Sequence, residues 1–139
     1  DLLNKDYQFD KHLDFLSTKI SDKRSTCSVL MDQKFFPGVG NYIKSEALYI
    51  AKTHPEEKWN NLSKQEKTNL IQKTQEIMQK SYQYGGAELR DFYNPFHKSL
   101  FQLKIYGKQY TEQKNKVTSK ITSDNRRTWM CLKTQKMKN

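Results

Sequence analysis

The sequence predicts a mainly α-helical protein that ends in a small β-hairpin. Apolar residues recur at helical spacing through much of the first 96 residues. After about residue 100 the pattern changes to short runs rich in β-branched and aromatic residues. A chain of 139 residues has room for one domain, or for one domain with a small appendage. We therefore expect a helical body over residues 1–96 and a basic β unit over residues 97–139.

Four segments of the first part are expected to be helices. They cover residues 9–20, 27–31, 42–52 and 63–84. The last has the clearest start, because Ser63 and Glu66 fit a capping box in which each side chain accepts a free backbone amide. Between the second and third helices, FFPGVGN (35–41) predicts a tight turn, since its proline and glycines interrupt helical structure.

The last third is expected to hold extended segments. They cover residues 100–106, 116–122 and 127–132. Ser123, Asp124 and Asn125 form a turn cluster between the second and third segments, so these two are predicted to pair as a hairpin.

The charge of the chain indicates a polyanionic partner. Its formal net charge is +10, and residues 97–139 carry +9 of it, from 11 Lys and Arg against 2 Asp and Glu. Aromatic residues are interleaved there, which favours a folded basic module over a tail, and nucleic acid is the usual partner of such a module. The sequence contains no run of about 20 apolar residues, so no membrane span is predicted. We also expect no secretory signal. Two cysteines do not make a disulfide scaffold and favour a reducing compartment.

The turn at residues 35–41 has the features of a phosphate site. Gly38 and Gly40 would let the backbone approach a ligand, and Asn41 would stand at the start of the next helix, where free amides attract anions. Lys34 could add a point charge. Taken alone these features are weak, because Asn41 could simply cap the helix and Lys34 could be an ordinary surface lysine.

Three longer segments give the turn a context. Residues 30–55 read LMDQKFFPGVGNYIKSEALYIAKTHP, residues 84–92 read YGGAELRDF and residues 102–108 read QLKIYGK. In this order they resemble the helix–two-turns–helix (H2TH) element, the Gly-Gly-x-x-Leu-Arg-Asp-Phe segment and the strand that leads into the finger of the Fpg/Nei DNA glycosylases. The resemblance spans nearly the whole chain. It implies an H2TH DNA-binding domain followed by a finger that together grip DNA around a damaged base.

The resemblance also implies which residues contact phosphates. The family's phosphate-binding Asn falls on Asn41, in the Gly38–Gly40 turn, and a nearby lysine falls on Lys34. The family's finger carries an Arg five residues before its third cysteine. If that cysteine is Cys131, the Arg is Arg126, and its neighbour Arg127 is the alternative.

The sequence departs from the family pattern at the finger. The family binds zinc there through four cysteines, and the corresponding residues are Gln113, Lys116, Cys131 and Thr134. One cysteine cannot build a tetrahedral zinc site. We therefore predict a zincless finger with no bound metal, and we expect Cys27 and Cys131 to be ordinary buried or half-buried thiols.

A second departure concerns catalysis. Family enzymes use an N-terminal proline or valine amine as nucleophile and an adjacent glutamate as acid and base, whereas this chain begins Asp-Leu-Leu-Asn. We assign no catalytic residue and no cofactor to it. We expect the DNA-binding half of a larger glycosylase/AP lyase for oxidised bases, inactive alone, with an N-terminal catalytic domain and damaged double- or single-stranded DNA as partners.

Finer points of the resemblance concern the branch and the lesion. Asn41-Tyr42-Ile43-Lys44-Ser45-Glu46 is closer to the endonuclease VIII branch than to the Fpg branch. His97 and Lys98 fall in a loop, residues 91–101, that can cover the lesion in some members.

Two other classes of function remain open at this stage. An H2TH protein that binds RNA or the ribosome, without enzymatic activity, would explain the charge and the turn but not residues 84–92 or the finger. A glycosylase-like chain could also serve purely as a binding or scaffold protein. For a repair function the expected location is the nucleus or another DNA-containing intracellular compartment.

Overall fold

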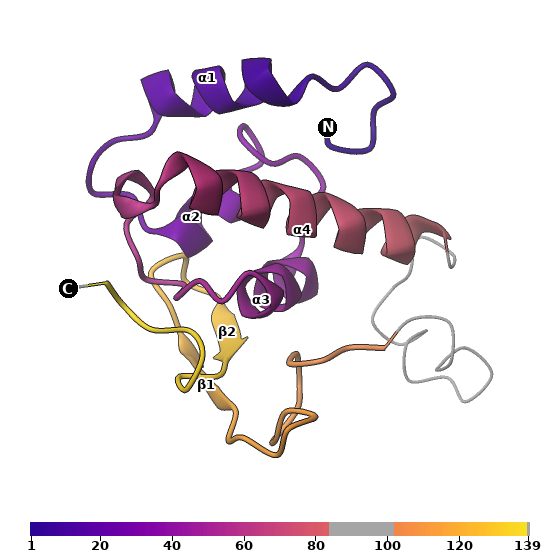
Figure 1. Cartoon of the computed structure of the whole chain (residues 1–139), viewed down its shortest axis with the longest axis vertical. Helices are drawn as coiled ribbons and strands as arrows, with labels where there is room; N and C mark the ends of the chain where they lie inside the picture. Colours follow the sequence, from indigo (N-terminus) through magenta and orange to yellow (C-terminus); the bar gives the residue numbers. More distant parts are fainter. Residues whose placement is uncertain (84–101, 139) are drawn as a thin grey trace.

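The computed structural model describes residues 1–83 and 102–138. Its elements are α1 (Phe9–Lys19), α2 (Thr26–Leu30), α3 (Asn41–Ile50), the 3-10 helix η1 (Trp59–Asn61), α4 (Lys64–Gln83), β1 (Thr118–Ile121) and β2 (Arg127–Met130). Helix α3 contacts α4 and strand β2, and Figure 1 shows the hairpin on the side of α3 that faces away from α4. The prediction of a mainly α-helical fold with a C-terminal hairpin is confirmed.

Helix α3 forms the centre of the helical body. Its side chains Ile43, Ala47 and Leu48 are buried, as the helical spacing of these residues predicted. They belong to one apolar cluster with Leu70 and Ile71 of α4. Because α3 is enclosed on two sides, its polar residues Lys44, Ser45 and Glu46 are buried as well.

The start of α4 is the predicted capping box. The Ser63 amide donates to Glu66 Oε1 (2.8 Å), and the Glu66 amide donates to Ser63 Oγ (3.0 Å). Each side chain thus accepts a backbone amide that the helix leaves without a partner, which fixes where α4 begins.

The hairpin is antiparallel, with Thr118 paired to Met130 and Ile121 to Arg127. Thr128 and Met130 are buried on its inner side, whereas Arg127 and Ile121 are exposed on the other side. This follows from the two-residue period of a strand. The predicted turn at residues 123–125 joins the strands, with Asn125 in the left-handed region (φ 64°), which asparagine tolerates.

The predicted strand at residues 100–106 is wrong over its described part, residues 102–106, which contain no strand. The amides of Lys104, Ile105 and Tyr106 donate to the carboxylate of Glu46 instead of to a neighbouring strand. The proposed boundary at residues 96–97 lies outside the described residues, and so do His97 and Lys98. None of the helices described is long and apolar enough to cross a membrane.

Candidate nucleic-acid interface

The turn that precedes α3 is held by the side chain of Gln33. Its Oε1 accepts the Gly38 amide (2.8 Å), and its Nε2 donates to the Val39 carbonyl (3.1 Å). Gly38 has φ +86°, a conformation that residues with a side chain rarely adopt. His12 of α1 adds a bond from its Nε2 to the Phe35 carbonyl (2.7 Å), which leaves its Nδ1 to accept from the Tyr7 hydroxyl. The turn is therefore fixed by side chains from outside it.

Gly40 differs from Gly38 in what its position requires. Its backbone is extended (φ −101°, ψ −177°), so any residue could adopt it, and no atom lies within 4 Å of where a Cβ would stand. Nothing in the described protein therefore demands glycine at this position. Open space beside the first residue of α3 is what the approach of a ligand to the helix N-terminus requires.

Asn41 is the first residue of α3, and its side chain does not cap the helix. Its Nδ2 donates to the Arg127 carbonyl at the start of β2 (2.8 Å). Since an amide nitrogen carries two hydrogens, one remains for an acceptor such as a phosphate oxygen. The Asn41 bond brings the turn before α3 and the hairpin together, although 86 residues separate them in sequence.

The two candidate arginines differ in their contacts. Arg127 lies along the hairpin, where its Nη1 donates to Ser119 Oγ (3.2 Å). Arg126 is exposed, and its guanidinium makes no hydrogen bond or ion pair within the described parts of the chain. An exposed guanidinium without a described partner, one residue from the Asn41–Arg127 bond, is suited to binding an anion.

Lys34 is exposed, and its amide donates to Asp32 Oδ1 (3.0 Å). No hydrogen bond joins Lys34 to Asn41 or to the hairpin among the residues described. The structure thus brings Gly40, Asn41, Arg126 and Arg127 into one region, while Lys34 is linked to it only through the chain of the turn.

Glu46 anchors the segment that leads to the hairpin. Its carboxylate, almost fully buried on α3, accepts the amides of Lys104, Ile105 and Tyr106, each at 2.8 Å. Burial raises the pKa of Glu46, and the three amides oppose that effect by favouring the charged form. The segment at residues 104–106 is in this way fastened to the same helix that carries Asn41.

A second set of side chains holds the hairpin turn against the helical body. Ser123 Oγ bonds Ser25 Oγ (2.5 Å) and donates to Glu56 Oε1 (2.6 Å). Asp124 pairs with Lys44 of α3 (2.7 Å). The turn therefore has a fixed position relative to α3 before any ligand arrives.

The comparisons with known proteins agree with this geometry. The model of the formamidopyrimidine-DNA glycosylase H2TH domain matches residues 4–93. The chain belongs to the formamidopyrimidine-DNA glycosylase family. The family's enzyme from Rickettsia conorii is 36% identical over 101 residues, which are 70% of this chain and 37% of that protein. The enzyme from Rickettsia bellii is 32% identical over 130 residues, which are 89% of this chain and 48% of that protein.

Solved structures of glycosylases share the fold. A viral DNA glycosylase matches 98% of this chain and 49% of its own, with a TM-score of 0.81 and 26% identity. The Lactococcus lactis Fpg, crystallised with DNA that contains an abasic site, matches 98% of this chain and 50% of its own, with a TM-score of 0.79 and 23% identity. The chain thus spans about half or less of the length of these relatives. They are named as Fpg or as viral glycosylases and do not specify the endonuclease VIII branch, which stays a prediction.

The finger positions of the family hold no metal-ligand set here. Among the described residues, no group of three or more His, Cys, Asp or Glu side chains could hold a metal ion. Cys27 and Cys131 are buried free thiols, as expected. The Cys131 amide donates to Gln135 Oε1 (2.8 Å), and Gln135 Nε2 donates to the Thr53 carbonyl (3.0 Å). A side-chain amide therefore ties the end of the hairpin to the helical body, and the absence of zinc stays a prediction.

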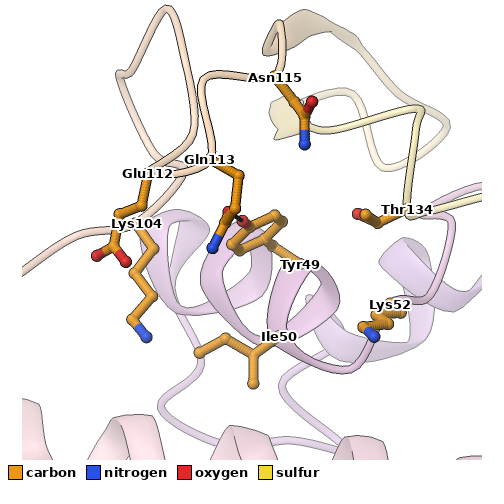
Figure 2. Close-up of a pocket in the computed structure, with 8 residues that line it drawn as sticks. All are labelled: Tyr49, Ile50, Lys52, Lys104, Glu112, Gln113, Asn115 and Thr134. Carbon is orange, nitrogen blue, oxygen red and sulfur yellow. Dashed lines mark hydrogen bonds between the residues drawn. The ribbon is translucent and has the colours of Figure 1, made fainter.

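A hollow lies at the other end of α3, near the finger positions of the family. Figure 2 shows the side chains around it, which come from the end of α3 and from the segments before and after the hairpin. It measures about 340 Å³ and is lined by Tyr49, Ile50, Lys52, Lys104, Glu112, Gln113, Asn115 and Thr134. Since Asn41 begins α3 and Ile50 ends it, this hollow and the candidate interface lie at opposite ends of the helix.

The residues that position the interface could not be identified from the sequence pattern. The turn and the hairpin are fixed by four polar side chains whose spacing in the sequence gives no sign of this role: Gln33, Lys44, Glu46 and Gln135. The one sequence signal for these positioning residues is a charged residue on the predicted inner side of a helix. Such a residue is buried only when it has a partner, and the partner lies too far along the chain to be read from spacing.

Proposed function

We propose that this chain binds the phosphate backbone of DNA as the DNA-binding half of a base-excision-repair glycosylase/AP lyase that acts on oxidised bases. The single observation that carries the proposal is the bond between Asn41 Nδ2 and the Arg127 carbonyl. It holds the N-terminus of α3 against the start of β2, so that the helix amides and the second hydrogen of the Asn41 side-chain amide lie close to the hairpin residues Arg126 and Arg127. Such a set of donors suits a phosphate.

Charge and open space support the same proposal. Residues 97–139 carry a net charge of +9, and the position beside Gly40 is unobstructed. Arg126 is the better candidate for the finger phosphate contact, because its guanidinium has no hydrogen-bonding partner in the described protein, whereas the Arg127 guanidinium donates to Ser119 of the hairpin. Lys34 is proposed as a further contact on the resemblance alone.

The rest of the proposed enzyme is inferred from the relatives. They are named formamidopyrimidine-DNA glycosylases and are about twice as long as this chain. We infer that an N-terminal domain supplies the amine nucleophile and its glutamate, and that the chain alone does not cleave DNA. Location in a DNA-containing compartment is part of the same proposal. RNA or ribosome binding is not favoured, because the matching family is one of DNA glycosylases.

The test uses the 139-residue chain and a duplex with an abasic-site analogue. Binding measured between about 50 and 200 mM salt is expected to weaken with a steep negative slope of log K against log salt, since each phosphate contact adds about −0.9 to it. Incubation with a true abasic site and borohydride is expected to trap no covalent complex. Tighter binding to a structured RNA than to the abasic duplex would refute the proposal, and trapping would refute the assignment of catalysis to another domain.

A further inference from the structure

A buried ion pair joins α3 to the hairpin turn. Lys44 Nζ lies 2.7 Å from Asp124 Oδ2, and the exposed fractions of the two side chains are 0% and 3%. The two residues are 80 positions apart in sequence. Because Lys44 is enclosed, its ammonium cannot itself reach a phosphate. Any effect of this residue on DNA binding must therefore pass through a neighbour.

The pair is not explained by stability alone. Removing two charges from water is costly, and a well-packed apolar pair of similar volume often stabilises a fold equally well. Burial lowers the pKa of Lys44, and the contact with Asp124 is the largest effect that opposes this. What an ion pair adds, compared with an apolar contact, is a defined direction for each partner.

The neighbour that the pair orients is Arg126. Asp124 Oδ1 accepts from Thr122 Oγ1 (2.5 Å) and from the Arg126 amide (3.4 Å). Thr122 closes the turn, because its amide donates to the Arg126 carbonyl (3.0 Å) and its hydroxyl proton is shared between Asp124 Oδ1 and that carbonyl, which lies 2.9 Å from Oγ1. One oxygen of Asp124 is thus held by Lys44, and the other shapes the turn from which Arg126 projects.

We propose that Lys44 is a positioning residue for DNA binding: through Asp124, it fixes the hairpin turn so that Arg126 faces the same phosphates as the N-terminus of α3. This inference rests on the proposed function, and it deepens it by naming what sets the geometry of the finger contact. It predicts that the removal of a buried charge, which touches no DNA, lowers the number of phosphate contacts.

The experiment compares Lys44→Met with Arg126→Ala, and uses Lys73→Met as the matched control. Lys73 lies on α4 with 33% of its side chain exposed, so its variant removes the same charge away from the hairpin. We expect Lys44→Met to weaken binding to the abasic-analogue duplex about tenfold and to reduce the salt slope by about 0.9, as Arg126→Ala does. Lys73→Met should leave the slope unchanged.

A double-mutant cycle separates positioning from general damage. If Lys44 acts through Arg126, adding Lys44→Met to Arg126→Ala should weaken binding less than twofold further. An undiminished tenfold loss on the Arg126→Ala background would overturn the inference. If Lys44→Met does not fold, Lys44→Met/Asp124→Leu supplies an apolar pair. This variant should fold and still show the reduced slope, and a wild-type slope would overturn the inference.

Failure of the inference can be told from failure of the proposed function. A wild-type chain whose binding does not depend on salt would refute the proposed function itself. Wild-type binding that Arg126→Ala weakens but that the Lys44 variants leave intact would refute only the positioning role.

Discussion

The two glycines before α3 should respond in opposite ways to the same substitution. Gly38 has φ +86°, and a Cβ there would lie 3.3 Å from the Met78 methyl group. Gly40 has an ordinary extended backbone, and a Cβ there would meet no atom within 4 Å. One methyl group therefore tests backbone strain at the first position and access for a ligand at the second.

The magnitudes follow from these geometries. Gly38→Ala should lower the free energy of unfolding by about 1–3 kcal/mol, the usual cost of a side chain in the left-handed region. Gly40→Ala should change it by less than about 0.5 kcal/mol. The gain of about 0.4–1 kcal/mol from a less flexible unfolded chain is offset by the poorer capping of alanine at the N-cap.

The affinity for DNA should respond in the opposite way, with the larger loss in Gly40→Ala. A methyl group at Gly40 would hold a phosphate away from the amides of α3, and the loss of one charge-assisted hydrogen bond, about 1.5–2 kcal/mol, corresponds to roughly 10- to 30-fold in Kd. Urea unfolding and fluorescence anisotropy on the abasic-analogue duplex measure the two effects. If Gly40→Ala binds DNA as tightly as the wild type, the inferred approach of phosphate to this turn is refuted.

Three further outcomes are expected. Glu46→Gln should destabilise the protein by about 3 kcal/mol in urea unfolding, because one amide oxygen cannot satisfy the three N–H groups that the carboxylate accepts; a change below 1 kcal/mol would contradict this. Burial lowers the pKa of both His12 and His54 below the usual 6.5, so the unfolded chain binds more protons and stability should fall as the pH drops below about 6.5. This dependence should flatten in His12→Gln/His54→Gln. Metal analysis of the purified chain should find no stoichiometric zinc, since Cys131 is the only ligand type at the four finger positions.

Local features of the fold could be predicted from the sequence, and long-range ones could not. The capping box, the turn at Pro37 and the hairpin turn depend on residues within a few positions of one another, and the structure confirms them. The strand expected at residues 100–106 depends on a partner elsewhere. There the local pattern was misleading, because the amides of that segment bond to Glu46 from a different part of the chain.

The candidate site shows the same division. Asn41 was placed correctly at the helix N-terminus, yet its side chain bonds the Arg127 carbonyl rather than capping the helix. That bond spans 86 positions and follows from how the hairpin packs on α3. The pairing of Lys44 with Asp124 was equally hidden, since a lysine in a helix and an aspartate in a turn are both common on protein surfaces.

The salt dependence of DNA binding by wild type and by Arg126→Ala tests most directly whether the chain grips phosphates at the junction of α3 and the hairpin. The proposed contacts predict a steep negative slope for wild type, and a slope smaller in magnitude by about 0.9 for Arg126→Ala. Asn41→Ala should weaken binding while the slope stays closer to that of wild type, because its side chain is uncharged. Identical slopes for wild type and Arg126→Ala would contradict the proposed role of the finger arginine.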